Sequence, residues 1–103
     1  MKIIMYGAPI CDDCVEEKAV LEKQKDIELD YRNITESTKI LKEFLAYRDN
    51  DEMFKDIIKN NKIGIPFYIL EDNTKTLDVF EHLNIEKPVV SGSSCSLDGS
   101  GRC

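Results

Sequence analysis

The sequence lacks any apolar run long enough to cross a membrane or to serve as the core of a secretory signal. Lys2 is followed by only Ile3, Ile4, Met5 and Tyr6 before Gly7 interrupts the run. A membrane-spanning helix needs about 20 predominantly apolar residues, and the core of a signal peptide about 7–15. We therefore expect a cytoplasmic protein with no membrane partner.

The sequence also has fewer basic residues than acidic ones. The chain has 14 Lys and Arg against 20 Asp and Glu, a formal net charge of −6. This acidity and the absence of a basic patch argue against a nucleic-acid partner. A length of 103 residues fits one domain, and a hydrophobic content of 42% is too high for a disordered chain. We expect a monomeric globular protein.

Few residues are available for redox or metal chemistry. Cys11 and Cys14 form a close CxxC pair, and Cys95 and Cys103 stand near the end of the chain. Without a secretory signal, permanent disulfides are not expected. A structural zinc site commonly needs two close pairs of ligands, and Cys95 and Cys103 are too far apart to be the second. His82 stands in a polar segment where a solvated side chain is expected, so we predict no metal site and a redox role for the CxxC pair.

The first third of the chain predicts a strand, a helix and a second strand. Residues 2–6 are continuously apolar, as in a strand buried on both faces, and residues 7–9 end that strand. Residues 12–25 are mostly good helix formers. Residues 27–34 alternate between apolar and polar side chains, which favours a second strand in a more exposed position. Two strands around a helix suggest a parallel unit.

The rest of the chain predicts further helices, a hairpin and a tail. Apolar side chains recur at helical spacing from Ile40 to Ile58, with Thr35 or Ser37 as the cap. Residues 67–70 and 76–80 read as an antiparallel hairpin, closed by a short helix over 81–85. The expected core includes Phe44, Leu45, Phe54, Ile58, Phe67 and Ile69. The Ser- and Gly-rich residues 88–103 read as a flexible tail, which leaves a domain over residues 1–87.

The CxxC pair lies directly after a buried strand and at the start of the predicted helix. The unpaired N–H groups and the dipole at a helix start favour a thiolate. Cys11, nearer the loop that we expect to be exposed, is the predicted nucleophile, and Cys14 is the predicted resolving thiol. Asp12 and Asp13 are either helix-start charges or tuners of the pair, and as tuners they oppose thiolate formation.

Over about residues 2–85, the sequence resembles the glutaredoxin branch of proteins with the thioredoxin-like fold. The matching features are the CDDC at 11–14 after the first strand and the Gly64-Ile65-Pro66 run before the third. The resemblance implies an α/β fold ordered βαβ then ββα, with a mixed four-stranded sheet flanked by helices. It implies thiol–disulfide oxidoreduction, a cis Ile65–Pro66 bond facing the redox pair, and substrate binding at Gly64, Ile65 and Pro66. The implied substrate is a disulfide-containing protein or a glutathionylated thiol.

Some features depart from the family pattern. Asp12-Asp13 replaces the usual Pro-Tyr, which predicts a weaker nucleophile than in typical members, and residues 76–80 do not match the Gly-Gly-Asp glutathione site. The electron donor is therefore either glutathione, as a cosubstrate with no tightly bound cofactor, or a thioredoxin reductase. The chain also resembles less-characterised glutaredoxin-related bacterial proteins at residues 47–50, 63–66 and 94–99.

Two alternatives stay open at this point. Cys95 and Cys103 are either an auxiliary dithiol that exchanges with the CxxC pair or incidental thiols, since a flexible tail holds its thiols at high effective concentration. The chain as a whole is either an enzyme or a non-enzymatic redox switch or binding protein on the same fold. Regulators of the arsenate reductase-like group use a CxxC as such a switch, but their Arg before the loop proline is missing near Gly64 and Ile65.

Overall fold

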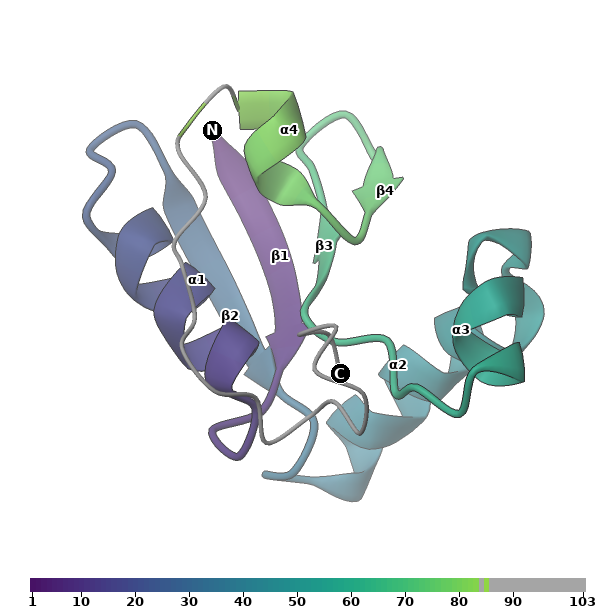
Figure 1. Ribbon diagram of the computed structural model, residues 1–103. Helices are drawn as coiled ribbons and strands as arrows, with labels where there is room; N and C mark the ends of the chain where they lie inside the picture. Colours follow the sequence, from purple (N-terminus) through teal and green to yellow (C-terminus); the bar gives the residue numbers. More distant parts are fainter. Residues whose placement is uncertain (84, 86–103) are drawn as a thin grey trace.

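A four-stranded mixed sheet forms the centre of the computed structural model, which describes residues 1–83 and 85 (Figure 1). Strand β1 (Lys2–Gly7) lies between β2 (Glu28–Asn33) and β3 (Phe67–Ile69), and β4 (Lys75–Thr76) follows β3. β1 and β2 are parallel, whereas β3 is antiparallel to both β1 and β4. The predicted mixed α/β fold is confirmed, and β2 stands at the edge, as its alternation indicated.

Helices flank this sheet (Figure 1). Helix α1 (Asp12–Glu22) connects the parallel strands and lies in front of the sheet in this view, as does α4 (Val79–Leu83). Helix α2 (Thr38–Asn50) lies behind the sheet and continues through the 3-10 turn η1 (Glu52–Phe54) into α3 (Lys55–Lys59). No described helix is long and apolar enough to span a membrane.

Successive side chains of β3 point to opposite faces of the sheet and therefore contact different neighbours. Phe67 points to the α2 side, where its ring centroid lies 5.0 Å from that of Phe54 and 6.3 Å from that of Phe44. Tyr68 points to the α1 side, where its hydroxyl donates to the carboxylate of Glu17 at 2.7 Å. Aromatic side chains therefore form the core on the α2 side of the sheet, whereas the α1 side contains the buried hydrogen bond between Tyr68 and Glu17.

Several predicted boundaries shift in the structure. Helix α1 ends at Glu22, three residues earlier than predicted. The returning strand is only β4, because Val79 and Phe80 belong to α4, where both are buried. Ile58 is 42% exposed rather than in the core, because α3 is short and only one of its faces packs inward. The other expected core positions are buried or packed against the core.

Only one of the two candidate caps of α2 is used. The Ser37 hydroxyl accepts the N–H of Ile40 at 3.2 Å, whereas the hydroxyl of Thr35 donates to Asn33. Helix α2 ends at Asn50, and the backbone of the next residue, Asp51, is extended. The predicted tail over residues 88–103, with Cys95 and Cys103, lies outside the described residues.

Candidate active site

Cys11 caps helix α1 with its own sulfur. Its backbone is extended (φ −102°, ψ 115°), and its N–H donates to the carbonyl of Ala8 at 3.1 Å. The Cys11 Sγ accepts the backbone N–H of Cys14 at 3.3 Å, within the sulfur hydrogen-bond range. A side-chain acceptor at this position satisfies one of the unpaired N–H groups at the helix start. The sulfur thus occupies the place that a Ser or Asp oxygen commonly takes.

The two thiols differ in acidity because one hydrogen-bonds to the other. The Cys14 thiol donates to the Cys11 sulfur, and this bond is the main reason that the pKa of Cys11 falls below its ordinary value. The same bond, followed by complete burial, strongly raises the pKa of Cys14. Both cysteines are free thiols. Of the two thiols, Cys11 is therefore the one that loses its proton first, and Cys14 keeps its proton.

Of the two acidic residues between the cysteines, Asp13 shifts the pKa of Cys11 in both directions. The charge of Asp13, which is 7% exposed, raises the pKa of Cys11, the direction expected from the sequence. The backbone N–H of Asp13 acts in the opposite direction. The hydrogen bond from Cys14 outweighs the charge of Asp13, so the net pKa of Cys11 is lowered. Asp12 is exposed and takes the position of a helix-start charge.

The expectation of an exposed Cys11 is wrong. Its side chain is 1% exposed, although the preceding Ile10 is 72% exposed and Asp12 is exposed as well. The physical reason is the cap itself, because accepting the N–H of Cys14 turns the sulfur inward over the first turn of α1. The thiol lies just beneath a surface loop, and it must be uncovered before it can meet a disulfide.

The loop before β3 reaches the same end of β1 as the cysteines. The Ile65–Pro66 bond is cis, as the resemblance implied. Tyr6 pairs with Phe67, and this antiparallel register carried one residue further sets Pro66 opposite Gly7. A Cβ on Gly7 would lie 3.0 Å from the Sγ of Cys14, so that sulfur packs directly on the end of β1.

Two residues hold this loop in place, and sequence reasoning missed both roles. Arg48 on α2 donates from Nε to the carbonyl of Ile63 and from Nη2 to that of Lys62, each at 2.8 Å. Gly64 adopts a φ of +98°, and a Cβ there would lie 2.8 Å from the ring of Phe54. A glycine two positions before a proline was a visible signal, whereas nothing in the sequence connects Arg48 to a loop 14–15 residues away.

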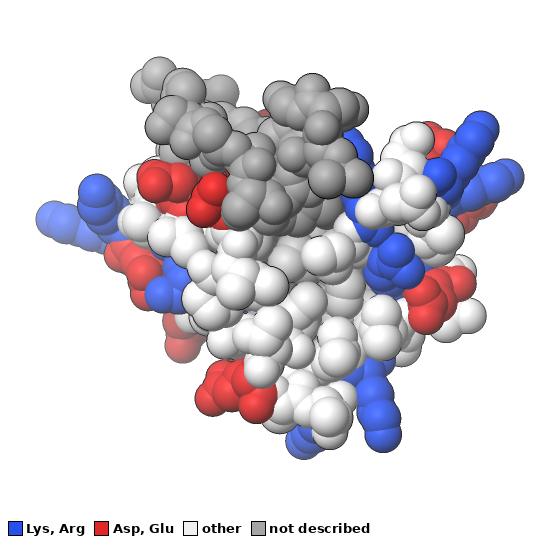
Figure 2. All heavy atoms as spheres, turned by 60° about the horizontal axis from the view of Figure 1, so that its bottom comes forward, with Lys and Arg blue, Asp and Glu red and all other residues white. Residues whose placement is uncertain are grey.

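The surface around this end of the molecule carries little charge at its centre. Figure 2 shows it from below, with Lys, Arg, Asp and Glu mostly at the periphery and other residues between them. A cavity of about 300 Å³ lies beside α1 and is lined by residues that include Pro9, Val15 and Tyr31. Val15 is 48% exposed and directly follows Cys14. The cavity therefore combines apolar side chains with the charged Lys18 and Glu22, which also line it.

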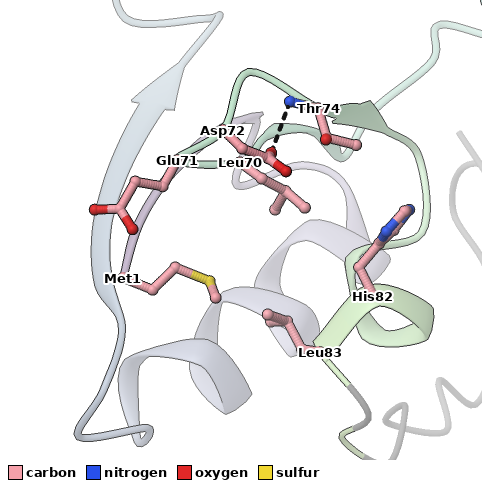
Figure 3. A pocket seen from close by; sticks show the side chains of 7 residues that line it. All are labelled: Met1, Leu70, Glu71, Asp72, Thr74, His82 and Leu83. Atoms are coloured by element: carbon pink, nitrogen blue, oxygen red, sulfur yellow. Dashed lines mark hydrogen bonds between the residues drawn. The ribbon is translucent and has the colours of Figure 1, made fainter.

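A larger cavity lies elsewhere. It measures about 490 Å³ and is lined by Met1, Leu70, Glu71, Asp72, Thr74, His82 and Leu83 (Figure 3). Met1 precedes β1, whereas Cys11 follows the other end of that strand, so this cavity lies at the opposite end of β1 from the two cysteines. Within the part of the chain that the structure describes, no group of three or more His, Cys, Asp and Glu residues is placed to hold a metal.

Comparison with protein-family models, with curated proteins and with solved structures finds no match to this chain. The resemblance to glutaredoxins consequently depends on the residues themselves, above all Cys11, Cys14 and the 64–66 run.

Proposed function

We propose that this chain is a glutaredoxin-like thiol–disulfide oxidoreductase on a thioredoxin-like fold, with Cys11 as nucleophile and Cys14 as resolving thiol. One observation carries the proposal. Cys14 donates hydrogen bonds to the Cys11 sulfur, and the pKa of Cys11 is lowered while that of Cys14 is raised. A dithiol mechanism needs such a division, because the first sulfur must be a thiolate and the second must remain protonated until its turn.

The reaction proceeds in two exchanges. The Cys11 thiolate attacks a disulfide sulfur of the substrate, the substrate S–S bond breaks, and one half leaves as a thiol. The Cys14 sulfur then attacks Cys11 in the mixed disulfide, and the second half leaves. A Cys11–Cys14 disulfide remains, and the substrate has gained two electrons. Of the two protons on its thiols, one comes from the Cys14 thiol and one from water, because Cys11 reacted as a thiolate. Glutathione or a reductase returns the pair to the dithiol.

The loop over residues 64–66 is the proposed substrate-binding element. The register of β1 and β3 brings it to the end of the sheet where Cys14 packs on Gly7, and Arg48 holds its preceding residues. The backbone of Ile65 is suited to hydrogen-bond an extended substrate there. The weakly charged centre of the surface in Figure 2 supports a disulfide-containing protein as substrate, and a glutathionylated thiol is the alternative that the resemblance implies.

A redox switch without turnover is the second candidate, and the burial of Cys11 favours it. A thiol that is 1% exposed reaches its buried neighbour more readily than it reaches a bulky external disulfide. Such a protein would form the Cys11–Cys14 disulfide and change its affinity for a partner, with no substrate reduced repeatedly.

Turnover separates the two candidates. The full chain is given the mixed disulfide of glutathione with a small thiol, with electrons from glutathione and its reductase or from thioredoxin reductase. Catalysis predicts many turnovers per chain with one of these donors, and their loss in Cys11→Ser. Oxidation of one dithiol per chain, with no further reduction by either donor, would instead establish the switch.

A further inference from the structure

Glu17 is an ionisable group buried in the interior that the proposed chemistry has not yet used. Its side chain is 1% exposed, on the face of α1 that packs on the sheet. A carboxylate removed from water is costly unless hydrogen bonds support it. The hydroxyl of Tyr68 on β3 supplies one such bond, donating to Oε1 at 2.7 Å. The fold thus maintains a polar contact where an apolar side chain would pack at lower cost.

The position of Glu17 ties it to the resolving cysteine. Glu17 follows Cys14 by three positions on α1, and residues at this spacing lie on one face of a helix with Cβ atoms about 5–6 Å apart. Both side chains are buried, so little water screens their interaction. The charge of Glu17 accordingly contributes to the raised pKa of Cys14.

The resolving exchange requires the Cys14 thiol to lose its proton inside the protein. In the reduced pair, the hydrogen bond and charge of Cys11 are prominent causes of the raised pKa of Cys14. Once Cys11 is part of a mixed disulfide, it carries no charge. The negative charge of Cys11 then no longer raises the pKa of Cys14. Burial still separates Cys14 from bulk water, so a nearby buried carboxylate is the natural recipient of the proton.

We propose that Glu17 accepts the proton of the Cys14 thiol during the resolving exchange, with Tyr68 orienting its carboxylate; this inference rests on the proposed function. The proton moves from the Cys14 sulfur to Glu17 as the Cys14–Cys11 bond forms and the bond from Cys11 to the substrate breaks. The departing substrate thiolate takes up one proton and Glu17 releases the one that it accepted, so the resolving exchange gains and loses no proton overall. The electron pair leaves with the substrate sulfur.

The other titratable groups near Cys14 are less suited to this task. Cys11 is bonded to substrate at that moment. Tyr31 on β2 interacts with both cysteines, but burial raises its pKa to about 12, so it stays protonated at neutral pH. The Tyr68 hydroxyl already donates a hydrogen bond to Glu17. Asp13 is a buried carboxylate as well, but its charge acts on Cys11, whereas the charge of Glu17 acts on Cys14. Glu17 is therefore the acceptor that these contacts favour.

Stopped-flow reaction with dithionitrobenzoate, an aromatic disulfide whose thiolate is coloured, tests the proposal. The full chain carries Cys95→Ser and Cys103→Ser, so that only Cys11 and Cys14 respond. A first release of thiolate, dependent on reagent concentration, reports the attack by Cys11. A second release, independent of concentration, reports the resolving attack by Cys14. The two phases separate the proposed function from the role of Glu17.

We expect Glu17→Gln to leave the first phase nearly unchanged and to slow the second about 100-fold at neutral pH, the lower end of what a positioned proton acceptor contributes. Glutamine has the same shape and still accepts from Tyr68, so the fold is retained. Tyr68→Phe should slow the second phase most at low pH, because its hydroxyl favours the ionised carboxylate. Glu16→Gln, on the exposed side of α1, should change neither phase.

Two results would overturn the inference while leaving the enzyme intact. If the second phase in Glu17→Gln is as fast as in the unsubstituted protein, Glu17 has no part in proton transfer. If it is faster and its pH dependence moves down, Glu17 acts only as a charge that opposes the Cys14 thiolate. Absence of the first phase in every form, by contrast, would contradict the proposed function itself.

Discussion

The sulfur of Cys14 packs against the backbone of Gly7, so closely that a Cβ on residue 7 would lie 3.0 Å from Sγ. The same Cβ would lie 3.3 Å from the ring of Tyr31 on β2. Gly7 is the last residue of β1, and Cys14 lies in the first turn of α1. The absence of a side chain at residue 7 thus lets the Cys14 thiol pack against the sheet.

Gly7→Ala should destabilise the reduced protein by about 1–3 kcal/mol, because an added methyl in a packed interior forces its neighbours apart. The free energy of unfolding from urea titration measures this. Ala46→Ser, at an exposed position of α2, is the control and should change stability by less than about 0.5 kcal/mol. Equal stability of Gly7→Ala and the unsubstituted protein would show that Cys14 does not press on β1.

Arg48→Ala should destabilise the chain by about 1–3 kcal/mol and weaken substrate binding, because two carbonyls before the 64–66 loop lose a charged donor. Unfolding in urea and the KM of the disulfide substrate report the two effects. Asp49→Asn removes only the exposed ion pair with Arg48 at 3.3 Å and should have little effect on either. A KM that is unchanged in Arg48→Ala would separate this loop from substrate binding.

Cys14→Ala should raise the pKa of Cys11, because the largest cause that lowers it is the hydrogen bond from the Cys14 thiol. Cys14→Ser keeps a hydroxyl donor at that position and should raise it less. The thiolate is the form present above the pKa, so alkylation of Cys11 should begin at higher pH in the alanine variant. Cys95→Ser and Cys103→Ser form the background. Identical pH profiles for the two variants would argue against this hydrogen bond as the cause.

The tail thiols remain a prediction, because Cys95 and Cys103 lie outside the described residues. If they form an auxiliary dithiol, a Cys14→Ser protein under mild oxidant should trap a Cys11–Cys95 or Cys11–Cys103 link. Non-reducing peptide mass analysis identifies such a link. A Cys11→Ser, Cys14→Ser protein is the control for links that involve neither active-site sulfur. Trapping neither link to Cys11 would end the auxiliary proposal.

The local order of elements was readable because each depends on neighbours in the chain. The apolar residues 2–6 and the alternation over 27–34 correctly indicated a central and an edge strand. The hairpin was placed correctly, but its second strand was overextended because Val79 and Phe80 suit either a strand or a buried helix. Periodicity alone does not separate the two over so short a run.

The amino-acid sequence by itself determined that two cysteines stand at the start of a helix after a buried strand, since strand, breaker and helix signals are all local. The resemblance supplied the cis Ile65–Pro66 bond. Only the tertiary structure decided that Cys11 is buried, and that Glu17 meets a tyrosine 51 positions away in sequence. Such contacts depend on how α1 packs on the sheet, and residue spacing carries no information about partners that distant.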